Sequence, residues 1–384
     1  MNSLIGIGAG PGNLSIAALA RNIPDLDVRL LEARSSSAWH SGLLFEQTGL
    51  QVSFLKDLVT PVDPTNPFSF LNFLKDNRRL YQFINAAFEQ TPCLEFDSYL
   101  RWVSGRLGCV TYGRTAQSVE LEKDHLRIIT DAGDTRTANV ALGLGQQPKV
   151  PRVTEPHLGR TFFHAGEFRQ RVESFEGQSI AIIGSGQSGT EVFLETISGR
   201  FGMPQRVNWI SRTSRFMPLD ETALTNEMFT PGFVNYFFDL PPAQRQKMNA
   251  EMHFTSNGIS PLSMRKLYQT LYTMRFLDRN EPKTALIPGH DLKAVIRNGS
   301  GWALTLKDRQ QGEEKTARAD CVILCTGYEA RPPDCIAPLI PELARDHQGP
   351  LINKDYSLVW TRPRRPKLFV VNAAKNPRKT RPQP

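Results

Sequence analysis

Residues 180–189 read Ile180-Ala181-Ile182-Ile183-Gly184-Ser185-Gly186-Gln187-Ser188-Gly189, and a helix-like stretch follows over 190–197. A short apolar run, a glycine-rich turn and a helix in this order predict the start of a βαβ unit that binds a dinucleotide. Glycine lets backbone N–H groups approach a pyrophosphate, and the N-terminus of the helix favours that anion electrostatically. We therefore expect the six residues from Gly184 to Gly189 to contact a dinucleotide cofactor.

A second copy of this pattern stands 176 residues earlier in the chain. There Leu4-Ile5-Gly6-Ile7 precedes the turn Gly8-Ala9-Gly10-Pro11-Gly12-Asn13, and a helix-like stretch covers 14–21. Repetition of a whole unit indicates an internal duplication. The candidate cofactor contacts of this copy are Gly8, Gly10, Pro11, Asn13 and Leu14. Asn13 replaces the third glycine, which is expected to loosen the packing of the helix on the strand while keeping the phosphate cradle.

Two further pairs of strands support the duplication. Each turn is followed by a second apolar strand, over 28–31 and over 207–210, and the similar stretches 140–145 and 322–327 both end in glycine. The carboxyl ends of buried parallel strands are where such sheets meet a ligand, so Gly327 is a further candidate cofactor contact. The predicted fold class is α/β, with two Rossmann-like dinucleotide-binding domains.

The residues after the second strands distinguish the two cofactors. Glu32 lies 24 residues after Gly8 at the end of its strand, where a carboxylate can bind both hydroxyls of an adenosine ribose. The second copy has no acid there and reads Ser211-Arg212, with Arg215 close by. Arginine with serine suits a ribose 2′-phosphate, which predicts NADP rather than NAD. Two such folds in one chain suggest FAD in the first and NADPH in the second.

The domain expectation follows from this order of motifs. We expect an FAD-binding domain over 1–165 that is completed by about 320–384, and an NADPH-binding domain over 166–220 and about 283–319. Helix-opening prolines at Pro241-Pro242 and Ser260-Pro261 predict a small, mostly helical insertion over 221–282, which is expected to bind the substrate.

Composition excludes several classes of protein. The net charge is +8, but residues 362–384 carry eight basic residues and no acid, so the remainder is neutral. A solvated basic end explains this better than nucleic-acid binding, because no nucleic-acid-reading motif is present. No apolar run approaches the roughly 20 residues of a membrane span, and no leader precedes Leu4. Five cysteines without zinc-ligand spacing predict a cytoplasmic protein with no metal.

Three stretches identify a family. Trp39-His40-Ser41-Gly42-Leu43-Leu44, the run from Gln51 to Val59 and the run from Asp63 to Leu74 resemble the flavin-dependent N-hydroxylating monooxygenases of siderophore synthesis. This is the lysine/ornithine N-monooxygenase family, and the lysine N6-hydroxylase and diamine branch is the most similar. Further matches, among them Asn226-Glu227-Met228-Phe229-Thr230-Pro231 and Thr255-Ser256-Asn257-Gly258-Ile259-Ser260, extend the resemblance from residue 4 to about residue 376.

The resemblance implies the reaction and the remaining site residues. NADPH would reduce FAD, O2 would add to give a C4a-hydroperoxyflavin, and the terminal amine of lysine, putrescine or cadaverine would attack it; no side chain is assigned as catalytic. Trp39 and His40 are expected beside the flavin and Gln51 facing it, with Lys56, Asn226 and Asn257 at the substrate. Alternatively, Lys56 forms a surface ion pair with Asp57, and each asparagine is a helix cap or turn residue. The family also implies a homo-oligomer.

The C-terminus departs from the family. From Pro377 the chain reads Pro377-Arg378-Lys379-Thr380-Arg381-Pro382-Gln383-Pro384 where relatives continue with a turn and a helix that close the flavin site. Three prolines in eight residues disfavour a helix. We therefore expect a shortened C-terminus that weakens flavin binding and leaks electrons to peroxide. The alternative function is an uncoupled or inactive paralogue, and a basic-tail binding protein is a third reading.

Overall fold

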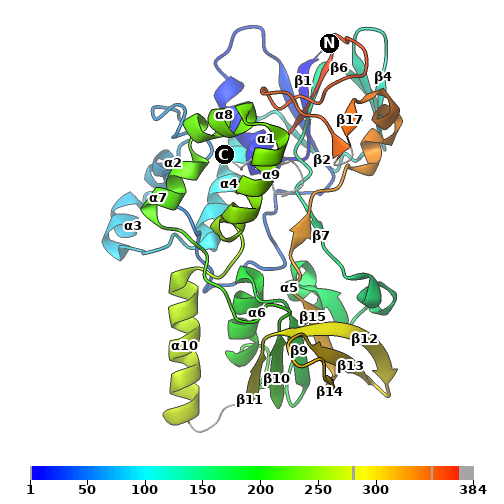
Figure 1. The fold of residues 1–384 in the computed structure, drawn as a ribbon. Coiled ribbons are helices and arrows are strands. Elements are labelled where there is room, and N and C mark those ends of the chain that lie inside the picture. The colour runs from blue at the N-terminus through cyan, green and yellow to red at the C-terminus, as the bar shows by residue number, and fades with distance from the viewer. Residues whose placement is uncertain (1, 279–281, 347–348, 372–384) are drawn as a thin grey trace.

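The computed structural model describes residues 2–278, 282–346 and 349–371. It contains two sheet-centred bodies, and the strands β7 (Gln147–Pro148) and β16 (Tyr328–Glu329) pair between them as an antiparallel ribbon (Figure 1). In the described ranges, no helix is both long enough and apolar enough to cross a bilayer.

The first body is built on a seven-stranded sheet in the order β3-β2-β1-β6-β5-β4, with β19 beside β6. The strands β1, β2, β3, β6 and β19 are mutually parallel, whereas β4 and β5 are antiparallel. Their bounds are β1 Asn2–Ile7, β2 Val28–Glu32, β3 Val110–Tyr112, β4 Ala116–Leu121, β5 Leu126–Thr130, β6 Gly133–Leu142 and β19 Lys367–Val370.

Helices of the first half cover this sheet through an aromatic-rich core. Pro11 at the first helical position opens α1 (Pro11–Ala20), which packs against α4 (Cys93–Leu107). The core between them includes Leu14, Phe70 and Tyr99, all essentially inaccessible to solvent. The other helices here are α2 Phe70–Asp76 and α3 Leu80–Ala86.

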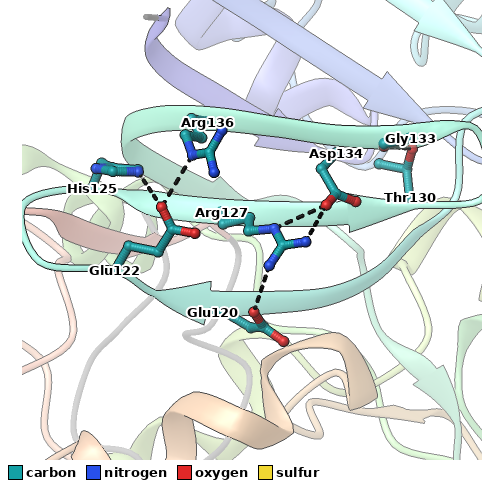
Figure 2. A network of polar contacts seen from close by, with 8 residues as sticks. All are labelled: Glu120, Glu122, His125, Arg127, Thr130, Gly133, Asp134 and Arg136. Carbon is teal, nitrogen blue, oxygen red and sulfur yellow. Dashed lines mark hydrogen bonds and ion pairs between the residues drawn. The ribbon is translucent and has the colours of Figure 1, made fainter.

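Charged side chains cross the outer face of the antiparallel strands. Figure 2 shows Arg127 on β5 between Glu120 on β4 and Asp134 on β6, and Glu122 contacting both His125 and Arg136. These residues are at least partly exposed, so water and salt screen each pair, and each contributes little to the free energy of unfolding.

The second body repeats the plan of the first. Its parallel sheet runs β11-β10-β9-β15-β8, so β9 lies between β10 and β15 as β1 lies between β2 and β6. The internal duplication predicted from the sequence is therefore confirmed. The bounds are β8 Phe162–His164, β9 Ser179–Ile183, α6 Gln187–Ile197, β10 Arg206–Ile210, β11 Lys283–Ile287 and β15 Cys321–Leu324.

Two strands lie on the other side of the expected domain boundaries. β8 falls within 1–165 and β15 within 320–384, yet both belong to the second sheet. Both strands therefore belong to the second body and not to the first. The expected boundaries differ because hydrogen bonding to β9, and not order along the chain, decides which sheet contains β15. A three-stranded antiparallel sheet packs on this body, with β12 His290–Asn298, β13 Gly301–Asp308 and β14 Glu314–Ala319.

The insertion after β10 is helical, as predicted. Proline opens its three longer helices, and Ser260 caps the last of them by accepting a hydrogen bond from the N–H of Ser263 (3.2 Å). The elements are α7 Ala223–Asn226, η3 Glu227–Phe229, α8 Pro231–Asp239, α9 Pro242–Glu251, η4 Met252–Thr255 and α10 Pro261–Phe276. Helix α10 packs against α6 at the side of the second sheet (Figure 1).

Short elements complete the described chain. They are η1 Arg152–His157, η2 Ala165–Glu167, α5 Phe168–Arg171, η5 Asp334–Glu342, β17 Arg345–Asp346 and β18 Gly349–Pro350. The divergent segment from Pro377 onward lies outside the described residues.

Candidate cofactor and substrate site

The first glycine turn joins β1 to α1 at the carboxyl edge of the first sheet. Gly8 has φ +89°, and a Cβ there would lie 2.6 Å from the carbonyl oxygen of Gly143. Gly10 is the N-cap of α1 and has no side chain to cover the first helical N–H groups. These amides remain available to an anion, as a pyrophosphate requires.

Asn13 fastens the helix to the strand. Its Nδ2 donates to the carbonyl oxygens of Gly8 (2.7 Å) and Ile7 (3.2 Å), and the residue is 1% exposed. The prediction of looser packing at this position is therefore wrong, because the amide occupies the space a smaller residue would leave and holds two carbonyl groups at the end of β1. Leu14, the next residue, packs in the core beneath the turn.

Glu32 supports the same turn from the end of β2. One carboxylate oxygen accepts from the N–H of Ala9 (2.9 Å) and the other from the N–H of Arg34 (3.0 Å). A carboxylate has about four acceptor positions, so two remain for ribose hydroxyls. The turn and Glu32 thus fit the adenosine and pyrophosphate of FAD.

Trp39, His40 and Gln51 lie in the irregular segment that follows β2. The Trp39 N–H donates to Asp97 (3.1 Å), and its ring lies edge-on to those of His40 and Phe96, with centroids 4.7 and 5.3 Å away. His40 is exposed with φ +47°, and Gln51 is half-buried. The aromatic contacts fix Trp39, and their relation to a flavin stays a prediction.

The second glycine turn repeats the geometry of the first. Gly184 has φ +122°, and a Cβ there would lie 2.1 Å from the carbonyl oxygen of Cys325. In the first turn a Cβ on Gly8 would meet the carbonyl oxygen of Gly143 in the same way. Gly189 lies so close to the turn that no side chain fits, since a Cβ there would lie 2.3 Å from the carbonyl oxygen of Gly184. Gly186 is the N-cap of α6, and Gln187 and Ser188 form the first helical turn with their N–H groups toward the N-terminus.

Hydroxyl groups gather where β10 ends. Ser211 Oγ donates to Ser185 Oγ (2.6 Å), and Thr213 Oγ1 lies 2.7 Å from Ser211 and 3.0 Å from Ser185. Arg212 and Arg215 are exposed beside this cluster. Three hydroxyls and two guanidinium groups suit a phosphate monoester, which agrees with a 2′-phosphate on the ribose.

Two residues of this cluster were not predicted as cofactor contacts from the sequence. Thr213 is one, and a serine or threonine in a turn is too common to stand out. Arg309 is the other: it lies in the turn between β13 and β14, and its Nη1 donates to the carbonyl oxygen of Arg212 (3.2 Å). That contact joins residues 97 positions apart in the chain, so no pattern within a short stretch of sequence predicts it.

Gly327 lies at the start of the ribbon between the bodies, with φ +81°. Its carbonyl oxygen accepts from Nε2 of His164 (3.0 Å), while Nδ1 of the same ring accepts from the N–H of Gly166 (3.1 Å). A ring that donates at one nitrogen and accepts at the other is neutral, and burial lowers the pKa of His164 accordingly.

The three expected substrate residues lie on exposed segments. Asp57 accepts from the N–H groups of Val59 (2.9 Å) and Phe70 (2.6 Å), and within the described part of the chain Lys56 forms no ion pair with it. The alternative surface pair is therefore wrong, and Lys56 projects from its turn, exposed.

The two asparagines make local contacts. Asn226 ends α7, and its Nδ2 donates to the carbonyl oxygen of Glu221 (3.3 Å) without capping η3. Asn257 Nδ2 donates to the carbonyl oxygen of His253 (2.9 Å), as a turn residue does. Both are exposed, and their amide oxygens remain available for a ligand.

Known proteins resemble this chain over nearly its whole length. The family model of L-lysine 6-monooxygenase/L-ornithine 5-monooxygenase matches residues 1–330. The chain is 32% identical over 373 residues to the L-lysine N6-monooxygenase of Escherichia coli, covering 96% of this chain and 88% of that protein. It is also 32% identical over 368 residues to the putrescine N-hydroxylase of Shewanella oneidensis, covering 92% and 73%.

A solved structure shows the same arrangement. The FAD-bound cadaverine monooxygenase of Erwinia amylovora superposes with a TM-score of 0.87 at 28% identity, and the alignment covers 97% of this chain and 88% of that one. Similarity therefore includes both glycine turns and the helical insertion that follows the second of them.

Proposed function

Because the chain belongs to the L-lysine 6-monooxygenase/L-ornithine 5-monooxygenase family, we propose that it hydroxylates the terminal amine of lysine or of a diamine such as putrescine or cadaverine. It is an FAD-dependent N-hydroxylating monooxygenase of siderophore biosynthesis, with NADPH as the electron donor and O2 as the oxidant. The observation that carries the proposal is the duplicated cradle: Gly8 and Gly184 each bring a turn against a neighbouring strand in a way that a Cβ would prevent.

The two cradles take different roles. FAD, when bound, supplies the redox chemistry with O2. Glu32 and the turn around Gly10 would hold its adenosine and pyrophosphate. Ser211, Arg212 and Arg215 would hold the 2′-phosphate of NADPH, since the charge and hydroxyl groups match that group.

The substrate residues belong to the same proposal. Lys56 supplies a positive charge for a substrate carboxylate, which favours an amino acid over a diamine. Asn226 and Asn257 border the amine with uncharged amide groups. A carboxylate against the reacting nitrogen would hold the amine protonated and non-nucleophilic, so neutral partners suit the reaction. Gln51 would face the flavin, beside Trp39.

The parts of the chain follow the two sheets. We propose an FAD part up to β7 that is completed by the segment from β16 onward, and an NADPH part from β8 to β10 and from β11 to β15. The insertion 221–282 provides substrate contacts.

The cellular context is also proposed. The enzyme would work in the cytoplasm as a homo-oligomer, without binding nucleic acid or membranes, since charge outside residues 362–384 balances. Tyr268, Tyr272 and Phe276 are exposed on α10 and offer an apolar contact between subunits. Light scattering of the purified protein measures its mass; a monomer at micromolar concentration contradicts self-association.

The reaction is tested with FAD-loaded protein. NADPH consumption, hydroxylamine and hydrogen peroxide are measured with lysine, ornithine, putrescine and cadaverine in turn. Hydroxylamine in proportion to NADPH with lysine or a diamine supports the proposal. NADPH consumption that yields only peroxide supports the uncoupled paralogue instead, and failure to bind FAD or NADPH refutes both.

A pair of variants tests the role of Lys56. Lys56→Ala should raise KM for lysine at least tenfold and leave KM for putrescine within about threefold, because only lysine has a carboxylate to bind. Lys75→Ala removes an exposed lysine from the last turn of α2 and serves as the control. Equal losses for both substrates would remove Lys56 from the carboxylate site.

A further inference from the structure

The side chain of Gln187 joins the second glycine turn to the start of α10. Its Nε2 donates to Oγ of Ser263 (2.9 Å) and to Oε1 of Glu191 (2.9 Å), and its Oε1 accepts from the N–H of Ser260 (2.9 Å). Both donor hydrogens and one acceptor position are thus used. Ser260 is fully buried, so this connection lies inside the protein.

The residues immediately before Ser260 in the chain are held by contacts with residues 217–219. Ile259 is fully buried, its N–H donates to the carbonyl oxygen of Met217 (3.0 Å), and its own carbonyl accepts from the N–H of Leu219 (2.8 Å). At Gly258 a Cβ would lie 2.5 Å from the Leu219 nitrogen. Asn257 stands one residue earlier, so its backbone is attached directly to this held segment.

A continuous set of short contacts thus leads from α6 to Asn257. In the proposed function the first turn of α6 would receive the pyrophosphate of the nucleotide, and Gln187 belongs to that turn. When bound nucleotide fixes the backbone of this turn, the Gln187 amide fixes Ser260 and the buried segment that carries Asn257. Because the residues between the first turn of α6 and Asn257 are buried or hydrogen-bonded, we expect a displacement of that turn to move Asn257 as well.

We propose that Gln187 is a positioning residue through which bound NADP⁺ sets the location of Asn257 and so raises the affinity for the amine substrate. The inference rests on the proposed function, since it takes Asn257 as a substrate contact. Coupling between two binding sites is reciprocal, so the amine should also tighten the binding of NADP⁺ by the same factor.

The test measures binding rather than turnover. Calorimetry gives the Kd of L-lysine and of putrescine for FAD-loaded protein, with and without saturating NADP⁺. The ratio of the two Kd values is the coupling. In the wild type we expect at least one amine to bind about tenfold more tightly with NADP⁺. Gln187→Ala should bring this ratio to about one, a change of about 1.4 kcal/mol.

Two further variants make the result specific. Ser263→Ala removes one acceptor of Gln187 on α10, leaves the glycine turn untouched and should lower the ratio several-fold, which also provides the test if Gln187→Ala does not fold. Gln178→Ala is the matched control, because among the described residues the Gln178 side-chain amide donates only to the nearby carbonyl oxygen of Ser174 (3.1 Å). It should keep the wild-type ratio.

Rates separate positioning from general damage. In Ser263→Ala, which leaves the glycine turn intact, the rate of flavin reduction by saturating NADPH should stay within about twofold of wild type, while KM for the amine rises several-fold. A wild-type coupling ratio of one, or an unchanged ratio in both Gln187→Ala and Ser263→Ala, would overturn the proposal. Absence of hydroxylamine from the wild type would instead refute the proposed function, and the binding ratios would still report on Gln187.

Discussion

Glu191, one turn after the second glycine turn, should make the free energy of unfolding fall as the pH rises. Burial raises the pKa of its carboxyl group from 4.5 to about 7, against the opposing effect of the hydrogen bond from Gln187. The residue as a whole is half-buried, and its carboxyl group lies close enough to the Cys325 thiol, just after β15, to raise the pKa of that thiol. Between these two pKa values the folded protein keeps a proton that the unfolded chain releases.

The sign and size follow from proton linkage. The stabilisation is complete below pH 4.5 and is lost as the pH rises through 7, with a ceiling of about 3.4 kcal/mol for a difference of about 2.5 in pKa. Between pH 5.5 and 8 the expected loss is about 2 kcal/mol. Nearby groups do not ionise in this window, because burial raises the pKa of Cys93 to about 11 and that of Tyr328 to about 12, and raises that of Cys325 as well.

Glu191→Gln isolates this effect. Glutamine keeps the shape of the protonated acid and a partner for Gln187 but cannot ionise. Urea unfolding of wild type and variant, followed by tryptophan fluorescence, gives the difference in unfolding free energy at each pH. Taking the difference cancels other groups, including His164, whose lowered pKa acts in the opposite direction. Two parallel pH profiles from 5.5 to 8 would refute the reasoning.

Three other variants have defined expectations. Gly184→Ala forces a Cβ to 2.1 Å from the Cys325 oxygen at φ +122°, so NADP⁺ affinity should fall at least tenfold by calorimetry while FAD binding persists; unchanged affinity would contradict the cradle geometry. Asn13→Ala removes the side-chain donor from the buried carbonyl group of Gly8, whereas the Ile7 carbonyl keeps the N–H of Gly143 (2.9 Å), so the unfolding free energy should fall by about 1–3 kcal/mol in urea; a loss below about 0.5 kcal/mol would show that water replaces the amide. Arg127→Ala, in the network of Figure 2, should leave the urea midpoint nearly unchanged because water and salt screen these pairs, and a clear drop of the midpoint would mean that they act cooperatively.

Some features of this protein depend only on short stretches of its sequence. A strand, a glycine turn and a helix are decided within about ten residues, because φ above zero at Gly8 and Gly184 and the apolar runs before them are local properties. The repetition of this pattern therefore predicted both cradles. The contrast between Glu32 after the second strand of the first copy and Ser211-Arg212 in the second copy predicted FAD for the first cradle and NADPH for the second. The prolines and serine before the helices of the insertion were equally local signals.

Other features required chain segments that are distant in the sequence to meet. Gln187 reads locally as a turn residue, but its amide is used by Ser260 and Ser263, more than 70 residues away. The assignment of β8 and β15 to the second sheet and the approach of Arg309 to Arg212 have the same origin. Periodicity and spacing describe one segment at a time, whereas these contacts exist only because packing of the two sheets fixes which side chains share a buried space.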